Sequence, residues 1–544
     1  MNATTQAIGS QHAGAGAVPP GDDVMALGGV AASAHPFVTQ TALDVIRHGG
    51  NAIDAAVAAA AVLTVVEPRN GHLGGDTFML INLPGENRVV ALNGSGAAPA
   101  AAALERYVER GGIPKDGLWA ASVPGTVHCW GTAVERYGSQ PLARLLAPAI
   151  AYAREGVPVT RRLHRMLANE AERFRPYPAS ARTFLPHGRV PAVGEIFRQP
   201  DLARSLERIA RDGWRDFYAG SLARELVQAS DELDGLFSLE DFANHDTLER
   251  APLSIDYRGY TVFEQPPVSQ GVIVLLALNI LRGFDVPALG PATAETIHLQ
   301  IEALKLAFED ARCHLGDPDH GELPLEMLLS DEHAREQAAR IRPDQARPWP
   351  WPGNIQPDTT YMCVADGQGT LVSYIHSLFA GCGVVLGDTG ALMNNRMLGF
   401  NLTPGHPNCL APGKRPVHTL NSYLVQRDGE PVLVGGTPGA HWQVQTNIQI
   451  LTNSLDFGME PHEAIAAPRF LIGDQIAVGD PTIRLESRAG AEVTASLRQK
   501  GHQIEEVGPW ALGGGVQLIA RDPATRVYRA ATDLRRPGNA VSGI

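Results

Sequence analysis

Two short runs of β-branched and aromatic residues around a glycine-rich turn form the most regular pattern in the chain. Residues 358–366 and 370–377 are rich in Thr, Val, Tyr and Ile, and Gly367-Gln368-Gly369 supplies the positive-φ positions of a short loop. The pattern predicts a β-hairpin. Counting outward from the turn places Thr359 opposite Ser377, and directly opposed residues have Cβ atoms about 4.5–5.5 Å apart. The two hydroxyls can therefore share a hydrogen bond.

Hydrophobic periodicity divides the rest of the chain into strands and helices. Expected strands are 77–82, 89–93, 257–267, 384–386, 423–425, 431–435, 516–520 and a late strand at Ile476. Expected helices are 39–48, 52–65, 271–282, 293–313 and 443–455, of which 52–65 is apolar nearly all round and should be buried. The middle of the chain, 142–246, reads as helical and charged, with Arg161-Arg162 and 170–175 as solvated faces. Because strands and helices mix without strict βαβ alternation, a layered α/β architecture is expected.

An irregular segment leads directly into the hairpin. Residues 342–353 hold four prolines, which lack the amide donor of a regular helix or a central strand. A cut between Asp358 and Thr359 would expose the Thr359 α-amine beside its own hydroxyl, and such an amine can serve as the base that activates the hydroxyl. The same residues also fit an ordinary hairpin with a threonine-rich edge.

Composition and charge narrow the possible partners and locations. With 44% hydrophobic and 19% charged residues and a net charge of -13, the chain lacks the basic balance of a nucleic-acid-binding protein. Its longest apolar run, 55–66, is too short to span a membrane. Five scattered cysteines indicate a reducing compartment, and residues 1–25 read as a disordered tail without an export signal. A cytoplasmic location is expected.

Several motifs follow one another in an order that resembles the γ-glutamyltransferase family of self-cleaving N-terminal-nucleophile hydrolases. They are Gly49 to Ala55, Val65 to Pro68, Thr359-Thr360-Tyr361, Gly387-Asp388-Thr389-Gly390, Asn394-Asn395, Lys414-Arg415-Pro416 and Gly436-Thr437-Pro438-Gly439. The resemblance covers about residues 26–544. It implies a four-layer αββα sandwich built from a large subunit, 26–358 including a linker at 342–358, and a small subunit, 359–544. It leaves open whether two such heterodimers pair.

The resemblance also assigns the catalytic roles. It implies cleavage after Asp358, Thr359 as nucleophile, Ser377 as the partner of its hydroxyl, and the amides of Gly439 and Ala440 as the oxyanion site. Alanine keeps its amide, so this role requires ordinary backbone angles at Ala440. No cofactor is expected. A metal site is not expected either, because His72, His376, His418 and His441 have no HExxH or CxxH spacing.

The pocket residues depart from the family pattern. Ser95, Phe379, Gly399 and His418 stand where the family places groups that hold the α-carboxylate and α-amine of a γ-glutamyl substrate. An unpaired ammonium in a dry site is penalised by several kcal/mol. The amide-cutting residues are therefore present, whereas the γ-glutamyl clamp is not.

Candidate substrate contacts cluster after two family motifs. Arg396 follows Asn395 and could grip a carboxylate through two hydrogen bonds, with His418 and Thr419 adding donors to the same anion. The alternative for Arg396 is a surface arginine. The pattern is similar to the family branch that hydrolyses other small amides, such as oxamate-type acids or acylated amines.

Three functions fit these observations. The first is a cytoplasmic, self-processing amidohydrolase acting on a small carboxylate-bearing amide through an acyl-enzyme on Thr359. The second is a γ-glutamyl hydrolase or transferase acting on glutathione and related compounds. The third is an unprocessed protein that binds a ligand without chemistry. Turnover of γ-glutamyl-p-nitroanilide separates the first two, and a denaturing gel separates both from the third.

Overall fold

Two seven-stranded sheets organise the protein. The computed structural model describes residues 22–349, 358–473, 480–536 and 538–544. One sheet has the order β1-β18-β17-β13-β12-β9-β8 and the other β19-β2-β10-β11-β3-β4-β7, and every pairing within these two sheets is antiparallel. A sheet of this kind joins strands that are far apart in sequence, which here brings the two halves of the chain together.

The strands of the first sheet are β1 (Val24–Ala26), β8 (Leu253–Tyr257), β9 (Tyr260–Glu264), β12 (Tyr423–Arg427), β13 (Glu430–Gly436), β17 (Gln517–Arg521) and β18 (Tyr528–Thr532). Those of the second are β2 (Gly29–Ser33), β3 (Asp76–Leu83), β4 (Arg88–Gly94), β7 (Leu248–Arg250), β10 (Asp358–Asp366), β11 (Leu371–Phe379) and β19 (Ala540–Gly543). In both sheets the central strands come from the C-terminal third of the chain, with N-terminal strands on either side. A cut before Thr359 would thus leave both products in both sheets.

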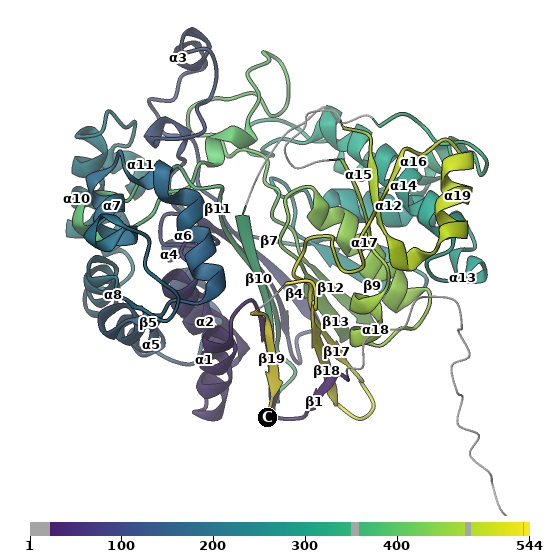
Figure 1. The fold of residues 1–544 in the computed structure, drawn as a ribbon, viewed down its shortest axis with the longest axis horizontal. Coiled ribbons are helices and arrows are strands. Elements are labelled where there is room, and N and C mark those ends of the chain that lie inside the picture. The colour runs from purple at the N-terminus through teal and green to yellow at the C-terminus, as the bar shows by residue number, and fades with distance from the viewer. Residues whose placement is uncertain (1–21, 350–357, 474–479, 537) are drawn as a thin grey trace, which may run out of the picture.

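Helices cover the outer face of each sheet (Figure 1). One layer includes α1 (Pro36–Arg47), α2 (Ala52–Val66), α4 (Thr126–Tyr137), α5 (Leu142–Glu155) and α8 (Pro200–Asp212). The other includes α12 (Val272–Leu281), α14 (Ala294–His314), α17 (Trp442–Leu455) and α19 (Ala491–Gln499). The helices of these layers are amphipathic or fully apolar, as the hydrophobic pattern predicts.

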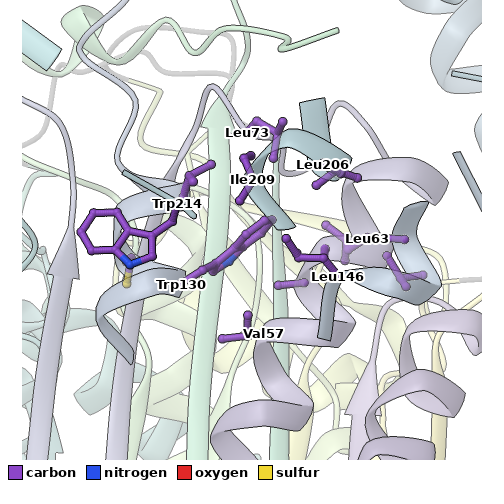
Figure 2. Close-up of a cluster of buried hydrophobic side chains, with 14 of the residues drawn as sticks. Val57, Leu63, Leu73, Trp130, Leu146, Leu206, Ile209 and Trp214 are labelled. Carbon is purple, nitrogen blue, oxygen red and sulfur yellow. The ribbon is translucent and has the colours of Figure 1, made fainter. Parts of the chain in front are cut away.

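Three of the five buried hydrophobic clusters of the described residues lie between these four layers. Figure 2 shows the core under α2, where Trp130, Leu146 and Leu206 meet. A second core lies between α12, α14 and the first sheet, and a third fills the space between the two sheets with side chains such as Phe78 and Tyr361. The helix–sheet–sheet–helix order confirms the four-layer sandwich that the resemblance implies.

The hairpin forms at the predicted register in the middle of its sheet. Thr359 pairs with Ser377, and the Asp366 amide donates to the Thr370 carbonyl at 3.1 Å across the turn. Asn51 caps α2 through the predicted first turn, and all fifteen residues of α2 are buried. The predicted buried helix is therefore confirmed.

Some local predictions are wrong. The strand expected over 257–267 is split, because Arg258, with φ 55°, and Gly259 form the turn between β8 and β9. Residues 384–386 form only an isolated bridge between Val385 and Leu392. The strand expected at Ile476 falls outside the described residues.

The charged helix in the middle of the chain is more buried than expected. The face expected to be solvated on α6 (Arg161–Phe174) holds a buried Glu170, ion-paired with Arg69 at 2.9 Å and with Arg173 at 2.6 Å. Within the described ranges, no helix has both the length and the apolarity to cross a membrane.

Candidate active site

Thr359 and Ser377 lie side by side on neighbouring strands, 1% and 0% exposed. The Thr359 hydroxyl donates to Ser377 Oγ at 3.2 Å, and the Phe379 amide donates to the same oxygen at 2.7 Å. The register breaks between Asp358 and Thr359, since Asp358 pairs with Phe379 while Thr359 pairs with Ser377. Phe379 itself has a φ of 63°, a region that bulky side chains avoid. The backbone irregularity thus falls on the predicted scissile bond.

The start of the linker is held by α14 and α19. The Arg347 amide donates to Glu302 at 3.1 Å, and Lys305, which is ion-paired with Glu302 at 2.8 Å, donates to the Arg347 carbonyl. The Ala346 amide donates to the Lys500 carbonyl at 2.7 Å. These bonds anchor the described part of the linker at one end, and β10 begins at Asp358 after residues 350–357.

The predicted oxyanion turn takes an unusual backbone conformation. Gly439 has a φ of 131° and Ala440 a φ of 54°, so Ala440 lacks the ordinary angles that its oxyanion role was expected to require, and that role now depends on whether its amide is unpaired. Neither amide donates a hydrogen bond within the described part of the chain. Gln270 fixes the turn, because its amide nitrogen donates to the carbonyls of Ala440 at 2.9 Å and Thr419 at 2.6 Å. Two amides without acceptors on a braced turn are free to bind an anion.

Asp76, Arg396 and His418, here called the inner cluster, lie behind the nucleophile. Asp76 pairs with Ser377 across β3 and β11, so it continues the row of Thr359 and Ser377. Arg396 Nε contacts Asp76 Oδ2 at 3.0 Å, and His418 Nε2 lies 4.0 Å from the same oxygen. All three side chains are 0% exposed. The inner cluster is therefore a closed, charge-matched group.

Burial dominates the electrostatics of the inner cluster. Burial raises the pKa of Asp76, against the opposing effect of Arg396. Burial, followed by the charges of Arg396 and Arg415, holds the pKa of His418 well below its usual value. His418 is consequently neutral at neutral pH, and the charge pair is Asp76 with Arg396.

Several polar atoms of the predicted substrate contacts have no partner. Among the described residues, Arg396 Nη1 and Nη2, both ring nitrogens of His418 and Thr419 Oγ1 form no hydrogen bond. The Arg396 guanidinium also stacks over the Phe379 ring at 4.6 Å. The surface alternative for Arg396 is wrong, since this arginine is fully buried.

Asn395 has a different setting. Its Oδ1 accepts the Ala380 amide at 2.8 Å, and its Nδ2 donates to the Lys115 carbonyl at 3.1 Å. Both polar atoms of Asn395 thus hold backbone in place after β11. The structure assigns this side chain a bracing position, and its proposed contact with substrate stays a prediction.

A cavity of about 430 Å³, here called the outer cavity, opens beside Thr359. Gly439 of the oxyanion turn also lines it. Its charged lining residues are Glu67, Arg69, Arg162, Arg165, Arg535 and Arg536. The arginine pair 161–162, expected on a solvated face, is split: Arg162 bonds Glu67 at 2.8 Å and lines this cavity. The outer cavity is the open approach to the nucleophile.

One group of metal-ligand type occurs among the described residues. Ligand atoms of His298, Glu302 and His502 lie within 4.8 Å of one another. The two histidines share a 2.8 Å hydrogen bond, and Glu302 is held by Lys305 and the linker. This group already has protein partners, and none of the histidines that the sequence singled out belongs to it.

Sequence reasoning missed three parts of the site. Asp76 closes a glycine loop and gave no sign of its arginine partner 320 residues later. Gln270 follows a proline turn with no distinguishing spacing. The arginines of the outer cavity come from separate segments and carry no common motif; only the charge of α6 could have drawn attention to Arg162 and Arg165.

Comparisons with known proteins agree with this geometry. Residues 38–543 match the family model described as gamma-glutamyltranspeptidase. The chain is 37% identical to the glutathione hydrolase-like YwrD proenzyme of Bacillus subtilis, over 94% of this chain and 97% of that protein. It is also 37% identical to the oxamate amidohydrolase proenzyme of Klebsiella pneumoniae, over 94% and 98%. The solved cephalosporin acylase from Bacillus halodurans superimposes with a TM-score of 0.90 at 35% identity, covering 100% of this chain and 99% of that one.

Proposed function

Since the chain belongs to the gamma-glutamyltranspeptidase family, we propose that it is a proenzyme that cuts itself before Thr359 and then hydrolyses a small carboxylate-bearing amide. The observation that carries the proposal is the hydrogen bond between Thr359 and Ser377 at 3.2 Å, located where the strand register breaks. A hydroxyl beside a second hydroxyl, at the end of a cavity and next to an irregular peptide, is suited to attack on that peptide. The names of its relatives, among them an amidohydrolase proenzyme, support the same chemistry.

Self-cleavage proceeds in three steps: attack, acyl shift and hydrolysis. Thr359 Oγ attacks the carbonyl carbon of Asp358 and forms a tetrahedral intermediate. The bond from that carbon to the Thr359 nitrogen breaks, so the acyl group moves from nitrogen to oxygen and the nitrogen takes a proton. Water then hydrolyses the ester, which releases the Asp358 carboxylate and restores the Thr359 hydroxyl. The product carries a free α-amine on Thr359.

The mature site uses the same hydroxyl on the substrate. The Thr359 α-amine takes the hydroxyl proton as Oγ attacks the amide carbon, while Ser377 holds the hydroxyl in position. The oxyanion that develops is bound by the free amides of Gly439 and Ala440. The amine half of the substrate then leaves with the proton that the Thr359 α-amine had taken, and water hydrolyses the acyl-enzyme. Losing one oxyanion donor typically lowers kcat by about 100- to 1000-fold.

The inner cluster supports a small acyl group that ends in a carboxylate. Arg396, His418 and Thr419 hold buried polar atoms without partners, and buried polar groups normally have one. An acyl carboxylate would pair with the outer edge of the Arg396 guanidinium, whose Nε is already held by Asp76. Because these side chains are buried, the acyl group is expected to be short.

The alternative is a γ-glutamyl hydrolase or transferase, and the name glutathione hydrolase-like of one relative favours it. A γ-glutamyl group brings an ammonium toward Arg396, which cannot lose its charge. Asp76 is the acidic group of the inner cluster and is already paired with that arginine. We therefore expect slow turnover of γ-glutamyl compounds.

A set of p-nitroanilides decides between the two. Purified enzyme is assayed with γ-glutamyl, oxalyl, succinyl and acetyl p-nitroanilides, with and without glycylglycine as acceptor. The proposal predicts that an acidic acyl group without an α-amine is cleaved fastest and that glycylglycine has little effect. Fast γ-glutamyl release at micromolar KM, accelerated by glycylglycine, would establish the alternative.

A further inference from the structure

The lining of the outer cavity opposes the charge of the whole protein. The chain has a formal net charge of -13, yet five arginines and one glutamate line this cavity beside Thr359. Arginine guanidinium groups keep their charge at neutral pH; burial lowers the pKa of Arg162 only to about 10. The outer cavity is consequently a local positive site on an acidic protein, and such a site attracts anions.

Three of the five arginines are already matched by carboxylates. Arg69 pairs with Glu170 at 2.9 Å, and Arg162 pairs with Glu67 at 2.8 Å. Arg535 contacts both oxygens of Glu486, at 2.7 and 2.8 Å. These arginines hold the walls of the cavity together and leave little charge for a ligand.

Arg165 and Arg536 are not matched in this way. Arg165 is exposed on α6 and forms no hydrogen bond or ion pair with any residue that the structure describes. Within the described ranges the nearest carboxylate to Arg536 is Glu67 at 4.0 Å, and the oxygen it approaches is already bound by Arg162 and by Asn70 at 2.6 Å. The Arg536 side chain is 18% exposed, so it is largely desolvated, and it has no close partner among the residues that the structure describes. A partly buried cation in this state gains from an anionic ligand.

We propose that the outer cavity binds an anionic group, a carboxylate or a phosphate, on the leaving amine of the substrate, through Arg165 and Arg536. This inference rests on the proposed function, because it assumes amide cleavage at Thr359. The inner cluster is closed, whereas the outer cavity is open and is lined by Thr359, so we assign the amine half of the substrate to the outer cavity. A volume of about 430 Å³ accommodates an amine the size of an aromatic ring with a carboxylate.

A matched pair of chromogenic substrates tests the proposal. Each short acyl group is supplied both as the p-nitroanilide and as the 3-carboxy-4-nitroanilide, which differ by one carboxylate on the leaving amine. A third anilide with a phosphonate at that position compares the two anion types. We expect the anionic anilides to be cleaved with a kcat/KM about 10- to 100-fold higher, the size of one to two charge-assisted hydrogen bonds, mainly through a lower KM.

Variants locate the effect. Arg536→Ala and Arg165→Ala should each lower the ratio of kcat/KM between anionic and neutral anilides by about 10-fold, and Arg536→Lys should retain part of it. Arg175→Ala is the matched control, because Arg175 caps the end of the same helix α6 and is half exposed, and its partners in the described part of the chain, Glu172 and Gly188, lie outside the cavity lining. A wild-type ratio near one, or a ratio that the variants leave unchanged, overturns the proposal.

The design separates this inference from the proposed function. Appearance of the cut chain on a denaturing gel and turnover of any neutral anilide report on the proposed function alone. If no anilide is turned over, calorimetric titration with 5-amino-2-nitrobenzoate and with p-nitroaniline still tests the outer cavity. The wild-type protein should bind the carboxylated amine at least about 10-fold more tightly, and Arg536→Ala should not. Equal affinities would overturn the inference even without turnover.

Discussion

Arginines lie on both sides of Thr359, and the two sides differ in how their charge is matched. Arg396 in the inner cluster is 0% exposed and bonded to Asp76 at 3.0 Å. Arg165 and Arg536 in the outer cavity have no carboxylate closer than 4.0 Å among the described residues. A buried cation must have its partner inside the protein, whereas a cation at an open cavity can take its partner from solution. We therefore expect that removal of the inner arginine destabilises the fold, whereas removal of an outer arginine affects ligand binding alone.

Removal of the inner arginine is expected to have the largest effect. Arg396→Ala leaves the Asp76 carboxylate buried without its partner, which typically costs about 3–5 kcal/mol. The free energy of unfolding is measured by urea denaturation in the Thr359→Ala background, where the chain stays uncut. Arg165→Ala is the control on the outer side and should change stability by less than about 0.5 kcal/mol. Equal effects of the two variants would erase the distinction between the two sides.

A neutral replacement of the inner pair separates stability from substrate binding. In the double variant Asp76→Asn, Arg396→Gln no charge is buried, and the introduced asparagine can still accept the Gly96 amide that Asp76 accepts at 3.0 Å. Most of the lost stability should return, and self-cleavage should proceed. If Arg396 binds the acyl carboxylate, the activation free energy for acidic acyl groups should rise by about 2–5 kcal/mol. This lowers kcat/KM roughly 30-fold to several thousand-fold. Full activity would remove Arg396 from the substrate site.

Acid should destabilise the protein through two buried histidines near the active site, His376 and His441. Burial lowers the pKa of His376 and of His441 to about 4, below the usual value of 6.5. Between these values the unfolded chain binds protons that the folded chain does not, so stability falls as the pH drops from about 6.5 to 4. Each histidine contributes at most about 1.4 kcal/mol per pH unit in that window. Urea midpoints measured across it should fall less steeply in His376→Gln, and a flat profile in the wild type would contradict the assignment.

The smallest expected effect lies at the oxyanion turn, which borders both sides. Ala440 has a φ of 54°, a conformation that costs an L-residue about 1 kcal/mol and that glycine adopts freely. Ala440→Gly should therefore raise the free energy of unfolding by about 1 kcal/mol or less, with the oxyanion amide retained. Thermal denaturation detects the shift, and the reverse exchange one residue earlier, Gly439→Ala, should move the midpoint in the opposite direction.

The sequence predicted the parts of the site that depend on local spacing. The turn at Gly367-Gln368-Gly369 sets the hairpin register, and that register alone brings Thr359 to Ser377. The pairing of Asp76 with Arg396 could not be predicted, because it joins segments 320 residues apart through the packing of the sheets. The same holds for the outer cavity, whose arginines meet only after α6 and the C-terminal segment fold together. The sequence therefore does not predict which charged side chains from distant segments meet in the folded protein.

Conversion of Thr359 into an N-terminal nucleophile underlies the whole proposed function. Intact-mass and N-terminal analysis of the purified, active protein tests it directly. We predict two chains, of which the smaller is residues 359–544, has 186 residues and begins Thr-Thr-Tyr-Met. Thr359→Ala should stay one chain without activity. An active preparation made only of the uncut chain, or a cut at another bond, would contradict it.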